Sequence, residues 1–218
     1  MKIKWYGHAA FQITTEKGIR IIIDPYESGS FSGALSYDKI EDEADIVLTS
    51  HDHADHNYTK DIRGKYNHIS KAGDHEIKDI KIKAIPCFHD SLGGKKGGSN
   101  LIFVITADGL NLVHMGDIGH SLDQELLKKI GKVDILLLPV GGFFTIDAVM
   151  AQKIMNDIKP SVTVPMHYKT LKCNFPIAPV EDFTKNQTNV RTLKESSIVI
   201  KKETLPKEPE IIVLQHAL

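Results

Sequence analysis

Short strand-like segments recur through the first half of the chain, and the clearest of them alternate hydrophobic and polar residues with the two-residue period of β-strands. Successive side chains of a strand point to opposite faces of a sheet, so this alternation makes one face apolar. The clearest case runs from Ile80 to Ile85, with lysines at 81 and 83. Glycine-containing turns at 16–18 and 107–109 predict hairpins and therefore antiparallel pairing. The strands expected in this half are 2–5, 9–14, 18–23, 69–72, 76–85, 100–106 and 110–115.

The second half of the chain changes to the 3.6-residue period of amphipathic helices, placed between short apolar strands. Leu122, Leu126 and Ile130 form one apolar stripe, and Ser121 with Gln124 predicts the start of that helix as a capping box. A second helix is expected at 147–158, with strands at 133–140, 161–165, 197–201 and 211–214. Together the two halves predict an α/β (α+β) fold, a four-layer αββα sandwich of two mixed β-sheets with helices on the outer faces.

Length, charge and cysteine content narrow the class of protein. With 218 residues, the chain is expected to form a single domain over 1–218. A net charge of -1 and a pI near 6.8 provide no basic surface for nucleic acid. Two cysteines cannot form a disulfide framework, which favours a reducing, cytoplasmic setting. No segment approaches the roughly 18 apolar residues of a membrane span, and no signal peptide is evident, so we expect a soluble, unprocessed protein.

The most distinctive polar segment is His51-Asp52-His53-Ala54-Asp55-His56, which follows the apolar run 44–50. Neutral imidazoles and carboxylates are the ligands that zinc and similar divalent metals prefer. If a buried strand ends near Ser50, the hexapeptide leaves the sheet edge as a loop. We therefore expect His51 and His53 to reach one metal, and Asp55 and His56 to reach a neighbouring one.

The pattern His-x-His-x-Asp-His after an apolar strand resembles the signature of the metallo-β-lactamase-fold hydrolases. Phe88-His89-Asp90, Gly116-Asp117 and Pro165-Met166-His167 follow in the order in which that superfamily places its remaining ligands. The segments 7–11 and 139–142 resemble the small, lactonase-like subgroup of predicted zinc-dependent hydrolases. The ligand pattern is specific for fold and metal site, and it says little about the substrate.

The resemblance implies the rest of the ligand set. His89 would be the third ligand of the metal held by His51 and His53, and His167 would join Asp55 and His56 at the second metal. Asp117 follows an apolar strand and is expected to bridge both ions, because a carboxylate can bind one ion through each oxygen. The expected cofactors are two divalent metal ions, zinc in the first place, with manganese or iron as alternatives.

Four further residues are candidates near this site, each with a structural alternative. In the resembling family an aspartate at the position of Asp24 lies near the metals, so Asp24 is expected to orient a ligand histidine or its loop, unless it caps a turn. His8 either points into the site or has a structural role. His120 contacts the site or the substrate, or is a turn residue, and Tyr168 is a substrate hydrogen-bond donor or a packed aromatic. The glycine-rich loop 91–99 is a candidate lid or a solvated connection.

The expected activity is hydrolysis of a small ester, lactone or phosphoester by water that two metal ions activate. Asp55 is the candidate catalytic residue, as a proton shuttle to the leaving group. The chain has neither a Gly-x-Ser-x-Gly nucleophile turn nor a Walker loop, so serine catalysis and ATP use are disfavoured. The expected partner is a small-molecule substrate, with neither nucleic acid nor membrane, and assembly into homo-oligomers stays open.

Three other functions stay open as alternatives. A nuclease or phosphodiesterase would use the same fold, although residues 117–167 are too few for the domain inserted in RNA-processing relatives. A di-iron redox protein is less favoured, because those relatives have glutamate where this chain has His53. A non-catalytic metal-binding protein differs from the hydrolase only in lacking turnover.

Overall fold

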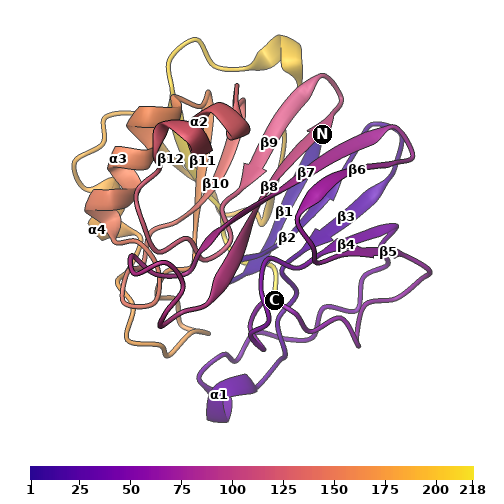
Figure 1. Ribbon diagram of the computed structural model, residues 1–218, viewed down its shortest axis with the longest axis horizontal. Helices are drawn as coiled ribbons and strands as arrows, with labels where there is room; N and C mark the ends of the chain where they lie inside the picture. Colours follow the sequence, from indigo (N-terminus) through magenta and orange to yellow (C-terminus); the bar gives the residue numbers. More distant parts are fainter.

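The computed structural model describes residues 1–218 and consists of two β-sheets packed face to face (Figure 1). The six-stranded sheet has the order β13 (Ser197–Val199), β1 (Lys2–Gly7), β2 (Ala10–Thr14), β3 (Arg20–Ile23), β4 (Ile46–Leu48) and β5 (Asn67–Ile69). The eight-stranded sheet has the order β12 (Val190–Thr192), β14 (Glu210–Val213), β11 (Val162–Met166), β10 (Ile135–Pro139), β9 (Leu110–His114), β8 (Ser99–Ala107), β7 (Ile80–Phe88) and β6 (Gly73–Ile77).

Both sheets are mixed, as the two halves of the sequence predict. Hairpins make β1, β2 and β3 antiparallel, and they make β6 to β9 antiparallel in the other sheet. The strands β9, β10, β11, β14 and β12 pair in parallel, as do β3, β4 and β5. The predicted sandwich of two mixed sheets is therefore confirmed.

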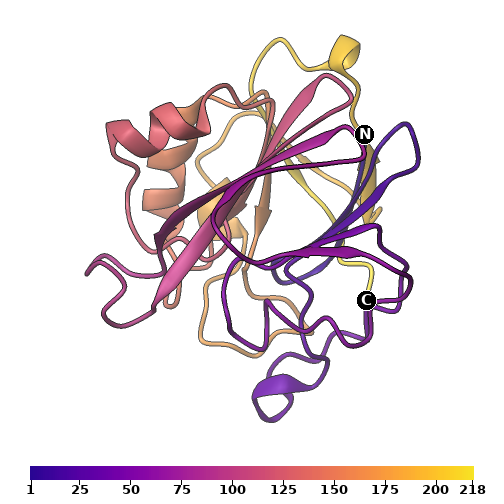
Figure 2. The ribbon, with the colours of Figure 1, turned by 45° about the vertical axis from the view of Figure 1, so that its right-hand side comes forward.

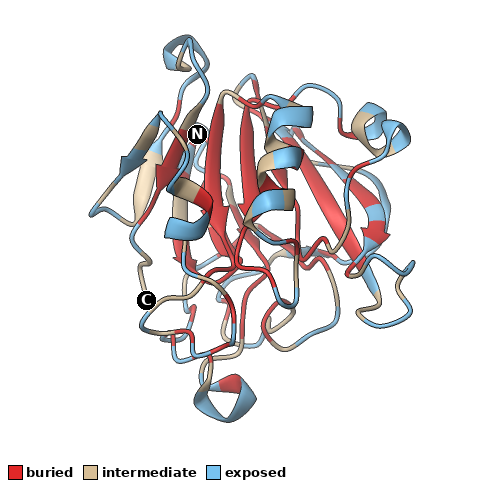
Figure 3. Ribbon diagram, turned by 90° about the vertical axis from the view of Figure 1, so that its left-hand side faces the viewer, coloured by how far each residue is buried: buried red, intermediate tan, exposed pale blue.

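The helices gather outside the eight-stranded sheet, as Figures 2 and 3 show. They are α2 (Gln124–Ile130), α3 (Ala148–Ile158) and the single turn α4 (Glu181–Thr184). The short segment α1 (Ser30–Gly33) projects from the body of the molecule, and a 3-10 turn, η1, spans Lys202–Thr204. None of these helices has the length and apolar character needed to cross a bilayer.

Alternation along the strands decides which side chains enter which layer. Ile21 and Ile23 point into the main core of 49 buried residues, which runs between the sheets and under the helices. Ile22, between them, points to the other face and joins a second cluster of 13 residues. That cluster contains Tyr26, Tyr37 and other residues of long loops, so loops rather than helices cover the outer face of the six-stranded sheet.

Three local predictions were wrong in detail. The expected strand 76–85 is a hairpin of β6 and β7, because Lys78 and Asp79 adopt left-handed φ values of 50° and 67° and form a tight turn. The strand expected at 69–72 is β5, which begins two residues earlier, ends at Ile69 and lies at the edge of the six-stranded sheet. Helix α2 begins later than the capping box implies, since the side chain of Asp123 is its N-cap and accepts from Leu126 N–H at 2.8 Å.

Six strands deliver polar residues to the same end of the sandwich. In the six-stranded sheet β1, β3 and β4 run in one direction, and in the eight-stranded sheet β7, β9 and β11 do so. Residues just beyond their carboxyl ends are His8, Asp24, the 51–56 loop, His89, Asp117 and His167. The topology alone therefore brings together side chains that are far apart in sequence.

Candidate metal centre

The carboxylate of Asp117 is the centre of the site. Its Oδ2 lies 3.1 Å from His56 Nε2, 3.2 Å from His89 Nε2 and 3.2 Å from His167 Nε2. His51 Nε2 is somewhat farther, at 4.0 Å. Asp117 is 2 % exposed, so four imidazole rings surround a carboxylate that water barely reaches.

The remaining side chains divide into two groups on either side of Asp117. His51, His53 and His89 form one group, with ring centroids 4.6 to 5.4 Å apart. Asp55, His56 and His167 form the other, and His8 joins them. A third set, His51, His56 and Asp117, links the two groups. The structure thus brings together every predicted ligand, in the two groups that the sequence and the family resemblance predict.

The spacing and the hydrogen bonding of these atoms fit divalent metal ions. Two ligand atoms bound to one tetrahedral ion at about 2.0–2.1 Å lie roughly 3.3 Å apart, close to the separations around Asp117. Nine buried side-chain polar atoms in the chain lack a hydrogen-bond partner, and seven of them belong to His8, His51, Asp55, His56, His89, Asp117 and His167. Buried polar atoms are rarely left unpaired, so this concentration is the arrangement expected of ligands.

Asp24 fixes the orientation of the 51–56 loop. Its Oδ1 accepts the Ser50 backbone N–H at 2.7 Å, and its Oδ2 accepts the Ser50 hydroxyl at 2.7 Å. The same Oδ2 accepts Nδ1–H of His56 at 3.0 Å. Asp24 is fully buried and oriented as a residue that holds a histidine and its loop in place.

These bonds also determine which ring nitrogens carry protons. Because His56 donates through Nδ1, its Nε2 is the atom that keeps the lone pair when the ring is neutral, and that atom faces Asp117. The Ser50 hydroxyl gives its proton to Asp24, so it accepts from Nδ1–H of His51 at 2.9 Å. His51 Nε2 therefore also keeps its lone pair toward the site. One buried carboxylate sets both imidazoles in the form that can bind a metal.

His8 supports Asp55 in the second group. Its Nε2 lies 3.0 Å from Asp55 Oδ2, and its ring packs on that of His167 with centroids 4.0 Å apart. Burial, with the neighbouring His167, lowers the pKa of His8 to about 4, so the neutral ring donates Nε2–H to Asp55. The other Asp55 oxygen, Oδ1, has no partner.

Burial and charge act in opposite directions on the central groups. Burial lowers the pKa of His51 to about 3, with a further contribution from His56. Burial alone would also lower the pKa of His56, but the Asp117 and Asp55 carboxylates raise it well above the ordinary value. Burial alone would raise the pKa of Asp117, whereas His167 and His56 lower it well below that of a free aspartate. The carboxylate is therefore ionised, as a metal ligand must be.

The backbone is left-handed at several of these positions. His8, Asp24 and His167 have φ values of 52°, 47° and 53°, which are uncommon for residues with a side chain. Gly116, before Asp117, has φ 55°, and a side chain there would collide with Asn100. Each residue turns the chain sharply just after a strand, and strain of this kind is concentrated at functional sites.

The structure places two candidate residues away from the metal cavity. His120 accepts Phe88 N–H at 3.2 Å and donates to Ser121 O at 2.8 Å, so it is the turn residue of the two alternatives. Tyr168 is 5 % exposed and packs on Trp5 with ring centroids 5.1 Å apart, as a core aromatic. Neither lines the cavity beside the metal groups.

Sequence reasoning missed Ser50 and Asn100. Asn100 accepts Asp117 N–H at 3.0 Å and donates to Met115 O at 2.9 Å, which fixes the segment that carries the central carboxylate. The available signal was an asparagine in an otherwise apolar strand, where a buried amide needs partners.

A cavity of about 430 Å³ opens beside both metal groups. Its polar side contains His53, Asp55, His89 and Asp117.

The glycine-rich loop 91–99 borders this cavity, and hydrogen bonds to Asp90 hold its backbone. Asp90 accepts backbone N–H groups of Leu92, Gly94, Lys96 and Gly97 at 2.6 to 2.9 Å. These bonds lower the pKa of Asp90, that from Gly97 most, so an ionised carboxylate organises the predicted lid segment.

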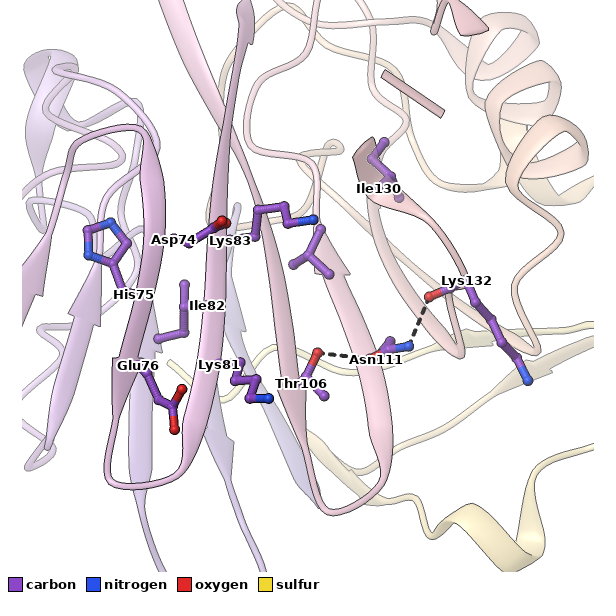
Figure 4. A pocket seen from close by; sticks show the side chains of 11 residues that line it. Asp74, His75, Glu76, Lys81, Ile82, Lys83, Thr106, Asn111, Ile130 and Lys132 are labelled. Atoms are coloured by element: carbon purple, nitrogen blue, oxygen red, sulfur yellow. Dashed lines mark hydrogen bonds between the residues drawn. The ribbon is translucent and has the colours of Figure 1, made fainter. Parts of the chain in front are cut away.

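A larger hollow, of about 580 Å³, lies elsewhere, over β6 to β9 (Figure 4). Its lining includes Lys81, Lys83 and His75, and Asn111 joins Thr106 to Lys132 across one side. None of the unpartnered buried atoms lies there. The unpartnered buried atoms of the two metal groups lie beside the smaller cavity instead.

Comparison with known proteins agrees with this geometry. The family model described as Beta-lactamase superfamily domain matches residues 2–167. A "UPF0173 metal-dependent hydrolase" of Thermococcus onnurineus is 33% identical over 91% of this chain and 99% of its own length.

Two solved structures show the same likeness in three dimensions. A Thermotoga maritima protein described as belonging to the metallo-beta-lactamase superfamily has a TM-score of 0.82 and 32% identity, covering 98% of this chain and 97% of that one. Igni18, a metallo hydrolase of Ignicoccus hospitalis, has a TM-score of 0.64 and 25% identity, covering 84% and 88%. With a superfamily match over most of its length and a full-length relative of this similarity, the chain belongs to the beta-lactamase superfamily and, within it, to the UPF0173 metal-dependent hydrolase family.

Proposed function

We propose that this protein is a hydrolase with a binuclear metal centre that acts on a small ester, lactone or phosphoester. The observation that carries the proposal is that seven of the nine unpartnered buried polar atoms belong to the histidines and aspartates grouped around Asp117. Such a cluster is costly in a folded protein unless something binds it. The names of the relatives, metal-dependent hydrolases, support the same activity.

The proposed ligands follow the two groups around Asp117. His51, His53 and His89 would hold one ion, and Asp55, His56 and His167 would hold the other. Asp117 would be shared by both, because its Oδ2 lies among the rings of both groups. Zinc is the first candidate, since it favours imidazole and carboxylate ligands and the description of the Thermotoga maritima relative names it. Manganese and iron are the alternatives to test.

When bound, two such ions lower the pKa of the water that they hold and polarise a carbonyl or phosphoryl oxygen. The chain's own residues supply the rest. Asp24 and Ser50 keep His51 and His56 in the tautomers that present Nε2. His8 holds Oδ2 of Asp55, and the free Oδ1 would take the proton released by the attacking water and pass it to the leaving group.

The substrate is proposed to be a small molecule, because the cavity of about 430 Å³ has the size of a ligand pocket. The net charge of -1 supports no nucleic-acid partner. Both cysteines are free and buried, which is the basis for proposing a reducing, cytoplasmic location.

The test is metal content and turnover measured on the same preparations. Mass spectrometry of the purified protein, before and after reconstitution with zinc, manganese or iron, should give about two ions per chain. The loaded protein should then hydrolyse a member of a panel of lactones, phosphodiesters and phosphomonoesters. Two ions without turnover on any ester class would favour the non-catalytic alternative, and iron with a redox signal would favour the di-iron one.

Three variants test the ligand assignment. Asp117→Ala should lose both ions, whereas His89→Ala and His167→Ala should each lose about one. His75→Ala is the matched control, because this histidine lies in the outer hollow of Figure 4 and belongs to neither metal group. Full metal content in Asp117→Ala would remove that residue from the bridging role.

A further inference from the structure

Four phenylalanines form one side of the cavity beside the metal groups, and the chemistry proposed above does not use them. They are Phe31, Phe143, Phe144 and Phe175, half of the eight phenylalanines in the chain. Their rings are in contact in series, Phe31 with Phe175 at 5.2 Å, Phe175 with Phe144 at 5.6 Å, and Phe144 with Phe143 at 4.7 Å between centroids. We call this continuous surface the aromatic wall.

The aromatic wall begins at the second metal group. Phe175 is 7 % exposed and packs edge-on against His8 with ring centroids 5.6 Å apart. His8 in turn bonds Asp55. From this buried anchor the wall extends outward to Phe144, Phe31 and Phe143, which are 43 %, 51 % and 74 % exposed. Isolated exposed apolar residues are ordinary, but a contiguous group of rings joined to a polar centre indicates a binding surface.

Three separate segments build the aromatic wall. Phe31 comes from α1, Phe143 and Phe144 from the connection between β10 and α3, and Phe175 from the chain after β11. Phe31 and Phe143 also adopt left-handed φ values of 53° and 62°, unusual for a bulky residue. A backbone that holds two exposed rings in unfavourable conformations over the same cavity points to a use for those rings.

The cavity is therefore apolar on one side and polar on the other. The polar side has the metal groups and Lys96, which is the one lysine in the lining. A substrate that fills about 430 Å³ would place its hydrolysable group at the metals and an apolar group against the rings.

We propose that the aromatic wall binds an aryl or alkyl group attached directly to the scissile bond, so that the substrates are apolar esters, lactones or phosphoesters. This inference rests on the proposed function and narrows its substrate class. Burial of an apolar group against these rings would stabilise the bound substrate in proportion to the area removed from water.

The test uses binding rather than turnover, so that it does not depend on which ester is hydrolysed. Hydroxamates chelate divalent metals, and acetohydroxamate and benzohydroxamate differ only in the apolar group beside the chelating atoms. Calorimetry on the zinc-loaded protein should show benzohydroxamate binding about 10- to 100-fold more tightly, with a more negative heat-capacity change. In Phe143→Ala/Phe144→Ala this preference should fall to about threefold or less.

Both substituted side chains are largely exposed, and Phe31→Ala provides a second variant if the double one does not fold. Leu171→Ala is the matched control, because Leu171 is a fully exposed apolar residue that does not line the cavity. The control should keep the preference of the unaltered protein.

The outcomes distinguish this inference from the proposed function. If both hydroxamates bind equally well, or if the preference persists in the variant without the rings, the aromatic wall does not bind substrate. The proposed metal centre is unaffected by that result. If the protein retains no metal, the proposed function fails and this inference fails with it. If the unaltered protein is a dimer and the double variant is a monomer, the rings are an interface between copies and the inference is wrong.

Discussion

Asp24→Asn should weaken metal binding by inverting the tautomers of two ligand histidines. The side-chain oxygen of the new asparagine must still face the Ser50 backbone N–H, because an amide nitrogen cannot accept that bond. Its NH₂ group then faces the Ser50 hydroxyl and His56 Nδ1, where Oδ2 now accepts two protons. His56 Nδ1 must become an acceptor, which moves the ring proton to Nε2.

The same substitution reaches His51 through Ser50. A hydroxyl that accepts from the asparagine turns its own proton toward His51 Nδ1, now 2.9 Å away, so this ring is also protonated at Nε2. His51 belongs to the first metal group and His56 to the second, so both sites lose a lone pair. Partners that orient a metal-binding histidine are typically worth 10- to 100-fold in affinity, or about 1.4 to 2.7 kcal/mol per site.

The assay is a zinc titration against a chromophoric chelator, together with the ring nitrogen chemical shifts of metal-free His51. Burial lowers the pKa of His51, so its ring is neutral and the shifts distinguish its two tautomers. Asp134→Asn is the control, because Asp134 is also buried but contacts no histidine of the site. It accepts Asn111 N–H at 2.8 Å and forms an ion pair with Lys202 at 2.7 Å. Zinc affinities within about threefold of the unaltered protein at both sites, with tautomers unchanged, would refute the reasoning.

Four other predictions concern the residues and ions that support the site. Gly119→Ala should lower affinity at the first metal group, because a methyl group there would collide with the backbone of His89; unchanged zinc stoichiometry and affinity would contradict it. Asp90→Asn should speed amide hydrogen exchange at Leu92, Gly94, Lys96 and Gly97, while the rest of the chain keeps its protection. The pKa of Asp90 is lowered on folding, so its stabilising bonds are fully present above the ordinary aspartate pKa of about 4. They should be lost only as the pH falls through the still lower folded value, and loss of loop protection near pH 6 would contradict this. Chelation of the metals should lower the unfolding temperature, since ions at about 1,000 times their dissociation constant stabilise by about 4.1 kcal/mol; an unchanged temperature after proven metal removal would contradict this.

The proposed ligands could be located from the sequence because each follows a strand whose apolar pattern is strong. His89, Asp117 and His167 each come just after a strand. Because β7, β9 and β11 run in the same direction, the ends of these strands lie at the same edge of the sheet. The capping box at Ser121 predicted the wrong start for helix α2. Asp123, two residues later, is an equally good N-cap residue, and its side chain caps the helix. Similarly, the 76–85 alternation concealed a turn, since Lys78 is not a typical left-handed turn residue.

The aromatic wall could not be predicted in this way, and the reason is physical. Phe31, Phe144 and Phe175 lie in segments without periodicity, and their rings meet only because these segments come together in the folded chain. Metal ligation in this fold follows from strand ends and short motifs, which are local. The shape of the cavity depends on three loops that meet only in the folded chain, so relatives with the same ligands are free to differ in substrate. The preference for benzohydroxamate over acetohydroxamate should therefore vary among this protein and its relatives with the residues at positions 31, 143 and 144, and not with the metal-binding motif.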